Sequence, residues 1–525
     1  MMKDKNLLCS LLCAAAGIIF CLLYYGHPVH DYGNYYFGSR FALEGKNIHD
    51  IYEPWRFNLL IRSQPGFAHL EFLENYAVVP PFTLYFYIPF TWMDVDTSKL
   101  VFNFLSVGVF CIALYGLLKH LNIRSWLVIT LPLLLFIPFR NNILFGQSYL
   151  LLAGFLMAGF VAQEKKKIWL AALFYSLAIV LKISPAILLL YLAATRQFRL
   201  LALTAATSAM LFLSALYFTG WDFMMEYIFN YIPRMSVNEI NNPYATTYQS
   251  VTVLLRNLFI PDKLLNPASH FDSYNAFALI SGICMGVLFF FFAKQLFKSK
   301  EPFSAFSFAL LGGCLFTAYT STYSLVFLVP AIIEVIRKNH AMSLLIFLLI
   351  FLVCNLPVNA FQSLPLLLRF PRLYLLLFLF FLLAGKQEFT GGKWKWLGAS
   401  VAFFIAVTFF TTKKSNDRSA YYVQDEISLL SYEFSFAGKE LTLQTLEAGG
   451  PAIKTIQLAD SIFSVQKIPL RENQVYYNGF LTSGNDHKLN PVVINKKEIV
   501  YLSDKNRGIG FYALRKIDLQ QETLR

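Results

Sequence analysis

Apolar stretches of about 15–25 residues recur along most of this 525-residue chain. Hydrophobic residues make up 57% of the sequence, charged residues make up only 14%, and the mean hydropathy is +0.52. A soluble protein of this length would divide into several domains and would need far more polar surface. Because a helix needs about 20 apolar residues to cross the hydrocarbon core of a bilayer, the pattern predicts a polytopic α-helical membrane protein.

The apolar runs predict about thirteen transmembrane helices. We expect spans near residues 7–25, 99–118, 126–139, 146–162, 168–182, 185–195, 199–219, 273–293, 303–319, 322–336, 342–356, 364–384 and 395–412. The first run is longer than the apolar region of a signal peptide, and no clear cleavage site follows it. We therefore interpret it as a retained signal-anchor whose N-terminus lies in the cytoplasm.

Lysine and arginine give the chain a formal net charge of +13. They gather in short clusters between the apolar runs, at residues 119–124, 164–167, 196–199, 294–300, 337–340 and 386–395. The predicted spans put all of these clusters on one side, which the positive-inside rule makes the cytoplasm. This distribution indicates membrane orientation rather than nucleic-acid binding. We expect a multi-pass protein of the cytoplasmic (inner) membrane with no nucleic-acid partner.

The segment 78–93 is apolar but is not counted as a crossing. It is short, and Pro80, Pro81 and Pro89 remove backbone donors that a lipid-facing helix needs. Counting it as a crossing would also turn the next four loops around and put the basic residues 164–167 outside. We expect a juxtamembrane or re-entrant element on the external side, and an external C-terminus.

The prediction divides the chain into a membrane domain, residues 1–412, and a C-terminal domain, residues 413–525. External loops are expected at 26–98 and 220–272, and the short amphipathic stretches of the second loop suit helices that lie in the interface. In the tail, alternating stretches such as ELTLQTL and KEIVYLS, separated by turn residues, predict short strands. We expect a small β-rich domain on the external, periplasmic side.

Several kinds of site are not indicated by the sequence. The seven cysteines all fall within apolar runs, so no disulfide framework and no cysteine-based metal site is implied. His30 and His49 are too scattered for a metal site. No phosphate-binding loop, dinucleotide fingerprint or nucleophile elbow has its required strand–helix context. We predict no metal and no cofactor.

Asp31 directly follows the first apolar run. An acidic residue at the mouth of a membrane helix is a functional candidate, and a carboxylate in a partly dehydrated cleft can remove the proton from a sugar hydroxyl. The alternative is an interfacial carboxylate that caps the next helix or pairs with Arg40. Glu44, Asp50 and Glu53 are either second carboxylates of a site or solvated loop charges.

Lys182 interrupts a long apolar run, and Pro185 breaks the helix three residues later. An intramembrane lysine is costly, so its ammonium either binds a phosphate or reaches the interface along its apolar stem. Arg369 and Arg372 lie at the outer end of a late span. Their forks of donors suit a phosphate, and the alternative is that they anchor the helix at the interface.

Two amides, Gln147 and Gln249, are expected on the external side. They can contact sugar hydroxyls or cap helices. The sequence alone does not decide between these roles.

Five stretches follow one another within roughly residues 27–385. They are DYGNYYFGSRFALEGKNIHDIYEP, YAVVPPF, FGQSYLLL, LAIVLKISPAILLLYLAATRQFR and YQSVTVLLR. In this order they resemble glycosyltransferase family 87, membrane enzymes of the GT-C class that depend on polyprenol-phosphate sugars. The best-known members of that family are α-1,2-mannosyltransferases. The resemblance therefore implies a GT-C type membrane domain and a polyprenyl-phosphate-mannose donor as co-substrate.

The resemblance also implies roles for single residues. Asp31 corresponds to the catalytic base, and Lys182 to a contact of the donor phosphate, for which Arg369 and Arg372 are further candidates. The candidate substrate-binding residues are Arg40, Glu44, Tyr76, Gln147, Gln249 and Tyr323. Tyr323 marks a departure, because the chain reads STYSLVFLVP where the family carries S-P-x-x-W-x-H-H before a proline. Tyr323 stands about where a histidine is expected, which leaves the identity of the sugar open.

These observations lead to one hypothesis and two alternatives. The hypothesis is an inverting glycosyltransferase that moves a monosaccharide from a polyprenyl-phosphate donor to a glycolipid or glycan acceptor on the external face, among membrane lipids. One alternative is a transporter or flippase of lipid-linked sugars, which predicts internal repeats that we do not find in the sequence. The other is a non-catalytic protein of envelope-polysaccharide assembly that works through residues 413–525.

Overall fold

The structure is a computed structural model, and it describes most of the chain. The described residues are 4–29, 31–67, 79–236, 242–262, 265–317, 320–338, 343–384, 393–411, 420–423, 431–447, 450–471, 474–477, 480–481, 488–504 and 512–519. Among these residues, helices follow one another up to Thr411, and ten strands follow from Ala420 onward. This helical body with a small C-terminal β region confirms the predicted mostly helical architecture and the β-rich tail.

The helices of the membrane domain follow in chain order. The first group comprises α1 (Lys5–Leu23), α2 (Tyr32–Leu43), α3 (Ile48–Tyr52), α4 (Pro54–Arg62), α5 (Pro81–Tyr87), η1 (Ile88–Trp92), α6 (Val95–His120), η2 (Trp126–Thr130), α7 (Leu131–Leu134), α8 (Phe136–Phe145), α9 (Tyr149–Glu164) and α10 (Ile168–Leu181). The second group comprises η3 (Ser184–Ala186), α11 (Ile187–Ala194), α12 (Phe198–Ser214), α13 (Leu216–Glu226), η4 (Tyr227–Tyr231), α14 (Ile232–Ser236), α15 (Val251–Phe259) and α16 (Tyr274–Lys298). The last group comprises α17 (Pro302–Phe316), η5 (Thr322–Leu328), α18 (Val329–Lys338), α19 (Ser343–Asn355), η6 (Val358–Phe361), η7 (Leu366–Arg369), α20 (Pro371–Ala384) and α21 (Lys393–Thr411).

Every predicted span coincides with a helix or with consecutive helices. Within the described ranges, three helices (α1, α6 and α16) are long and apolar enough to cross a membrane, or up to five spans if two bent pairs each count as one. The bent pairs are η2–α7 with α8, at 48°, and α12 with α13–α14, at 99°. The other predicted spans correspond to helices of 17 residues or fewer, except α21, which has 19 residues but is not among the helices counted as long and apolar enough. The count of about thirteen crossings therefore stays a prediction.

The segment expected to be a short external element forms two short helices. α5 has seven residues and begins with Pro81, and η1 has five residues and contains Pro89. Proline is tolerated in the first turn of a helix because the N–H there has no intrahelical acceptor. The prolines therefore start these helices, and neither helix is long enough to cross a bilayer core of about 30 Å.

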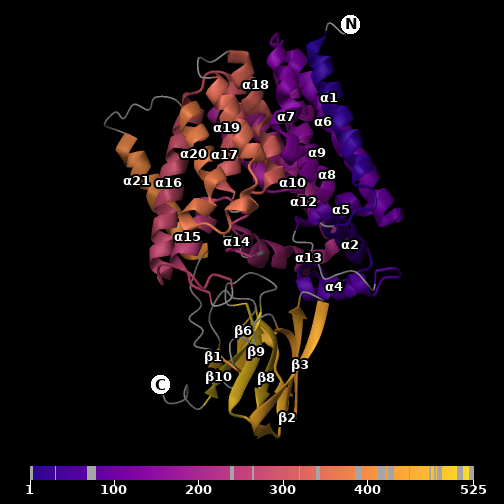
Figure 1. The fold of residues 1–525 in the computed structure, drawn as a ribbon, viewed down its shortest axis with the longest axis vertical. Coiled ribbons are helices and arrows are strands. Elements are labelled where there is room, and N and C mark those ends of the chain that lie inside the picture. The colour runs from indigo at the N-terminus through magenta and orange to yellow at the C-terminus, as the bar shows by residue number, and fades with distance from the viewer. Residues whose placement is uncertain are drawn as a thin grey trace.

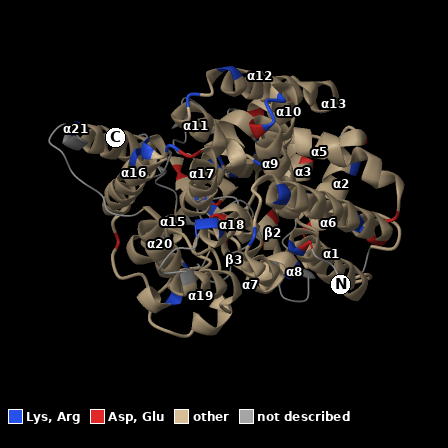
Figure 2. Ribbon diagram, turned by 90° about the horizontal axis from the view of Figure 1, so that it is seen from above, with Lys and Arg blue, Asp and Glu red and all other residues tan. Residues whose placement is uncertain are grey.

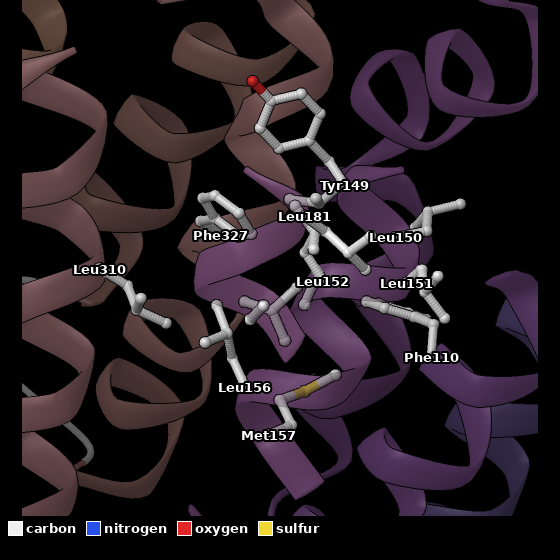
Figure 3. Packing of buried hydrophobic residues seen from close by; sticks show 14 of the residues in the cluster. Phe110, Tyr149, Leu150, Leu151, Leu152, Leu156, Met157, Leu181, Leu310 and Phe327 are labelled. Carbon is white, nitrogen blue, oxygen red and sulfur yellow. The ribbon is translucent and has the colours of Figure 1, made fainter. Parts of the chain in front are cut away.

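α9 lies at the centre of the helical body. Its fully buried leucines pack toward Phe110 of α6 on one side and toward Leu310 of α17 and Phe327 of η5 on the other (Figure 3). Gly154 allows the close approach of α6, because a Cβ there would lie 2.8 Å from the side chain of Val109. In Figure 3 the ring of Tyr149, the first residue of α9, points away from the apolar cluster. This orientation turns its hydroxyl out of the core.

The two ends of the helical body differ (Figure 1). The N-terminus lies at one end, and the β region lies beyond the other, with α2, α4, α13 and α14 between the long helices and the β region. The two loops predicted to be external therefore lie at the same end as the β region. Figure 2, seen from the N-terminal end, shows basic residues on α12, α16 and α18. The side of the membrane that each end faces stays a prediction.

The described part of the β region contains ten strands. They are β1 (Ala420–Tyr421), β2 (Ser431–Glu447), β3 (Gly450–Ile462), β4 (Val465–Lys467), β5 (Leu470–Arg471), β6 (Gln474–Tyr477), β7 (Phe480–Leu481), β8 (Lys488–Ile494), β9 (Glu498–Ser503) and β10 (Ala513–Asp518). One sheet has the order β1-β10-β9-β8-β4, while β2 pairs with β3 and β5-β6-β7 form a third sheet. All of these pairings are antiparallel. The predicted boundary at 412 falls between α21 and β1.

The β region is joined to the membrane domain by buried contacts. Trp55 of α4 stacks on Tyr432 of β2 with ring centroids 4.8 Å apart and an interplanar angle of 8°. Arg234 of α14 forms an ion pair with Asp504, which follows β9, and both side chains are buried. Removing one partner of a buried ion pair strongly destabilises a protein, because the remaining charge stays buried without compensation. The two parts are therefore packed as one body at this contact.

Candidate active site

Asp31 immediately precedes α2, but its side chain makes no capping hydrogen bond to that helix. Instead its Oδ2 accepts a hydrogen bond of 2.6 Å from Nε2 of Gln147. Arg40, the other partner considered from the sequence, pairs with Glu44 at 3.2 Å on the surface of α2. Asp31 is only partly buried. Its carboxylate is therefore held by an amide and keeps some access to a ligand.

Gln147 reaches Asp31 because Gly146 ends α8 in the left-handed conformation, with φ 64° and ψ 38°. A Cβ at Gly146 would lie 2.6 Å from the Cβ of Tyr32, so only glycine allows this approach to α2. The side chain of Gln147 is 5% exposed, and its oxygen accepts hydrogen bonds from the hydroxyl of Tyr35 at 2.8 Å and from Nζ of Lys182 at 3.0 Å. Both ends of this amide are therefore occupied.

Lys182 lies directly after α10, where the backbone becomes extended with φ −150° and ψ 135°. Pro185 follows in η3, in agreement with the predicted break of the helix. The ammonium of Lys182 lies 4.1 Å from the ring centroid of Tyr149 and 5.9 Å from that of Tyr35. These cation–π contacts and the bond to Gln147 fix the position of the charge. Asp31 acts on the same ammonium electrostatically.

Tyr323 also lies against Tyr149, with ring centroids 5.3 Å apart. Its backbone carbonyl accepts a hydrogen bond of 2.9 Å from Nδ2 of Asn142 in α8. Asp31 is close enough to Tyr323 for its carboxylate to act on the hydroxyl electrostatically. The structure therefore brings Asp31, Gln147, Lys182 and Tyr323 into one neighbourhood, although the loops that carry them are far apart in the sequence.

A second lysine, Lys99, lies near the same carboxylate. It is buried near the start of α6, it donates to the carbonyl of Pro28 at 3.1 Å, and it is within electrostatic range of Asp31. Tyr32, next to Asp31, hydrogen-bonds to Ser98. Burial raises the pKa of Tyr32, and the bond to Ser98 opposes that shift. Tyr32 therefore remains a neutral neighbour of the carboxylate.

Gln249, Arg369 and Arg372 form a second cluster. The amide of Gln249 donates to the carbonyl of Arg369 at 2.9 Å, and its oxygen accepts the backbone N–H of Arg372 at 3.1 Å. The guanidinium of Arg372 is buried and donates to Thr322 at 2.8 Å and to the carbonyl of Leu356 at 2.9 Å. Through these hydrogen bonds Arg372 connects α20 to Thr322, the residue before Tyr323. The arrangement corresponds to the capping alternative for Gln249.

The other predicted residues lie apart from this neighbourhood or cannot be described. Arg40 and Glu44 pair with each other, and both side chains are more than a third exposed. Tyr76 lies outside the described residues. Glu53 is buried at the contact with the β region, where Tyr512 donates to it. Within the described ranges, no group of three or more His, Cys, Asp or Glu side chains could hold a metal ion.

Three residues of the site were missed by the sequence analysis. Tyr35 lies four residues after Asp31, one helical turn on, so its position on the same face was a usable signal. Tyr149 follows Gln147 by two residues within FGQSYLLL. Lys99 gave no comparable signal, because it lies at the edge of a predicted span and comes close to Asp31 only through the packing of α6.

The arrangement pairs a carboxylate with a cation across one buried amide. A carboxylate can accept a proton from a hydroxyl, and a fixed ammonium can stabilise negative charge on a departing oxygen. Fold and site together define a helical membrane protein whose charged groups meet where three helices begin or end. Such a site suits a transfer reaction in which a hydroxyl is deprotonated and the leaving group departs as an anion.

Comparison with known proteins finds a similar family for part of the chain. Residues 78–322 match glycosyltransferase family 87. A protein of Mycolicibacterium smegmatis described as a polyprenol-phosphate-mannose-dependent alpha-(1-2)-phosphatidylinositol mannoside mannosyltransferase is 26% identical over 165 residues. That match covers 28% of this chain and 37% of the relative's length. No solved structure matches the chain significantly.

These comparisons confirm the resemblance predicted from the five motifs. The family and the relative support glycosyl transfer as the reaction class, and the apolar helices are consistent with a membrane protein. Of the neighbourhood around Asp31, the matched region includes Gln147 and Lys182. Asp31 itself precedes the matched region.

Proposed function

We propose that this protein is an inverting, metal-independent glycosyltransferase of the membrane. It transfers a monosaccharide, mannose by the relative's name, from a polyprenyl-phosphate donor to a glycolipid or glycan acceptor. The observation that supports this most directly is the amide of Gln147, which hydrogen-bonds both Asp31 and Lys182. It holds a base and a cation in fixed relation, as displacement at an anomeric carbon between an acceptor hydroxyl and a phosphate requires.

In the proposed reaction the acceptor oxygen attacks the anomeric carbon of the donor sugar. Asp31 takes the proton of that hydroxyl while the bond between the anomeric carbon and the phosphate oxygen breaks. The polyprenyl phosphate leaves with the bonding electrons, and Lys182 stabilises the negative charge that develops on it. Attack opposite to the leaving group inverts the anomeric configuration. Tyr35 and Tyr149 keep the ammonium of Lys182 in place through their rings.

We propose that this reaction takes place at the end of the membrane domain that faces the β region, on the external side. Two features support that side. The residues predicted to be cytoplasmic by their basic clusters lie on α12, α16 and α18 at the N-terminal end (Figure 2). Asp31 follows the end of α1 that is remote from the N-terminus. The β region would then stand next to the acceptor.

The test is transfer from radiolabelled polyprenyl-phosphomannose in membranes that contain either wild-type protein or Asp31→Asn. We expect a labelled product with wild type and a rate lower by roughly 10²–10⁴-fold with Asp31→Asn, because general-base catalysis contributes about that much. Equal rates would rule out Asp31 as the base. Label in neither sample, repeated with glucosyl and arabinosyl donors and several acceptors, would contradict the proposed reaction.

A further inference from the structure

A groove of about 760 Å³ lies between α16 and α21. Aromatic side chains form much of its wall, including Phe289 and Phe290 of α16 and Phe403 of α21. Two basic side chains, Lys294 and Lys298, line the same groove. Figure 1 shows α21 on the outer side of α16, away from the central helices. The groove is therefore distinct from the site around Asp31.

The groove begins where a close contact between the two helices ends. At Gly282 and Gly286 an added Cβ would lie 2.5 Å from the Cα of Ile405 and 2.6 Å from the Cα of Val401. Ser400 also donates to the carbonyl of Gly286 at 2.8 Å. These glycines let the backbones touch. From Phe289 onward, large side chains replace them, and space opens between the helices.

The register of this antiparallel pair locates the lysines. Residue 282 of α16 faces residue 405 of α21, and residue 286 faces residue 401. In this antiparallel register the backbone start of α21, at residue 393, lies level with Lys294, so Lys298 extends one turn beyond the start of α21. The groove thus ends in two lysines one turn apart on α16.

The chemistry of the lining residues is one-sided. Among the described residues that line the groove, Lys294 and Lys298 are the charged ones, and none of these residues is acidic. Trp396, at the same end, is 74% exposed, as expected of a tryptophan at the boundary between lipid and water. This end belongs to the basic cluster 294–300, remote from the β region. An occupant therefore needs a negative head and a long apolar tail.

We propose that this groove binds an anionic glycerophospholipid of the leaflet at the N-terminal end, with its phosphate between Lys294 and Lys298. One acyl chain lies along Phe289, Phe290 and Phe403. Anionic lipids of the cytoplasmic leaflet attract basic residues near the membrane surface. The sugar donor is a less suitable occupant, because the groove opens at the end opposite to Asp31. Bound lipid would fill the space that α21 leaves against α16.

The test is native mass spectrometry of the purified full-length protein after equilibration with equal amounts of phosphatidylglycerol and phosphatidylethanolamine. The charge variant is Lys294→Gln with Lys298→Gln. Its matched control is Lys165→Gln with Lys166→Gln, which removes the same charge from an exposed turn at the same end. A second variant, Ala399→Trp, fills the groove without changing its charge.

We expect wild type and the control to retain phosphatidylglycerol preferentially. The charge variant should lose this preference by about five-fold per lysine, and Ala399→Trp should lose bound lipid of both kinds at this site. Equal retention of the two lipids by wild type, or equal losses in the charge variant and its control, would overturn the proposal. Preferential capture of added undecaprenyl phosphate through the same lysines would overturn the choice of glycerophospholipid. None of these readouts depends on glycosyl transfer.

Discussion

The hydroxyl of Tyr512 lies 2.7 and 2.8 Å from the two carboxylate oxygens of Glu53, although 459 residues separate the pair in the sequence. Glu53 is 1% exposed and Tyr512 is fully buried. A buried carboxylate that loses its donor carries a large desolvation cost. This contact therefore couples the β region to the helices that follow Asp31.

Removing that hydroxyl should loosen the contact. We expect Tyr512→Phe to lower the free energy of unfolding by roughly 1–3 kcal/mol, because Glu53 then loses a buried donor. The measurement is thermal unfolding of the detergent-solubilised protein. Tyr476→Phe is the control, since Tyr476 is 42% exposed on the same β region. Equal unfolding temperatures for wild type and Tyr512→Phe would show that the bond contributes nothing.

The same contact predicts a pH dependence. Burial, followed by the charge of Glu53, raises the pKa of Tyr512 well above its ordinary value. A group whose pKa is raised in the folded state contributes fully below its unfolded pKa, which is about 10 for tyrosine. This contribution should be lost as the pH rises above about 10 toward the higher folded pKa. The free energy of unfolding, measured across that pH range, should fall more steeply with pH for wild type than for Tyr512→Phe.

Gln147 should act as a positioning residue rather than as a sugar contact, because its amide is already bonded at both ends. We expect Gln147→Leu to lower the transfer rate and to move the acidic limb of the pH–rate profile to higher pH. The carboxylate of Asp31 would lose a donor that favours its charged form. The measurement is the transfer rate as a function of pH.

A matched control exists for that variant. Gln163 is also buried, and it also bonds two partners, Tyr191 at 2.6 Å and Tyr175 at 2.9 Å. Gln163→Leu should perturb packing to a similar extent but leave the shape of the pH–rate profile unchanged. If both variants shift the profile alike, Gln147 has only a structural role.

Lys182 should matter for the donor more than for the acceptor. We expect Lys182→Gln to lower kcat by roughly 10²–10³-fold, the usual cost of removing one group that stabilises transition-state charge. Lys182→Arg keeps the charge but presents a larger, planar fork, so we expect partial rescue only. Steady-state kinetics with varied donor checks this. A kcat unchanged in Lys182→Gln would exclude the proposed contact with the leaving phosphate.

Gly146 should be intolerant of any side chain. Gly146→Ala would place a Cβ 2.6 Å from Tyr32 at a residue with φ 64°, and we expect a loss of stability of about 1–3 kcal/mol together with lower activity. Gly116→Ala is the control, because nothing lies within 4 Å of a Cβ there and alanine favours the interior of a helix. Normal activity of Gly146→Ala would show that the turn can relax.

Much of the site was predictable from its residue types. Asp31 and Lys182 are charges at the ends of apolar runs, and such charges are costly unless they have a role. Tyr323 was named as a candidate substrate-binding residue at a departure from a family motif. The roles of these residues were harder to predict than their identities. Gln147 and Gln249 look alike in the sequence. Gln147 hydrogen-bonds Asp31 and Lys182, whereas Gln249 hydrogen-bonds the backbone of Arg369 and Arg372.

The sequence by itself determined the helical membrane class, the positions of the apolar helices and the β character of the tail. These follow from local hydropathy and from period-two alternation, which depend on near neighbours along the chain. Only the tertiary structure decided that Gln147 connects Asp31 to Lys182, and that Glu53 meets Tyr512. Such contacts depend on how helices pack and on single close approaches such as Gly146 to Tyr32. No periodicity along the chain encodes those distances.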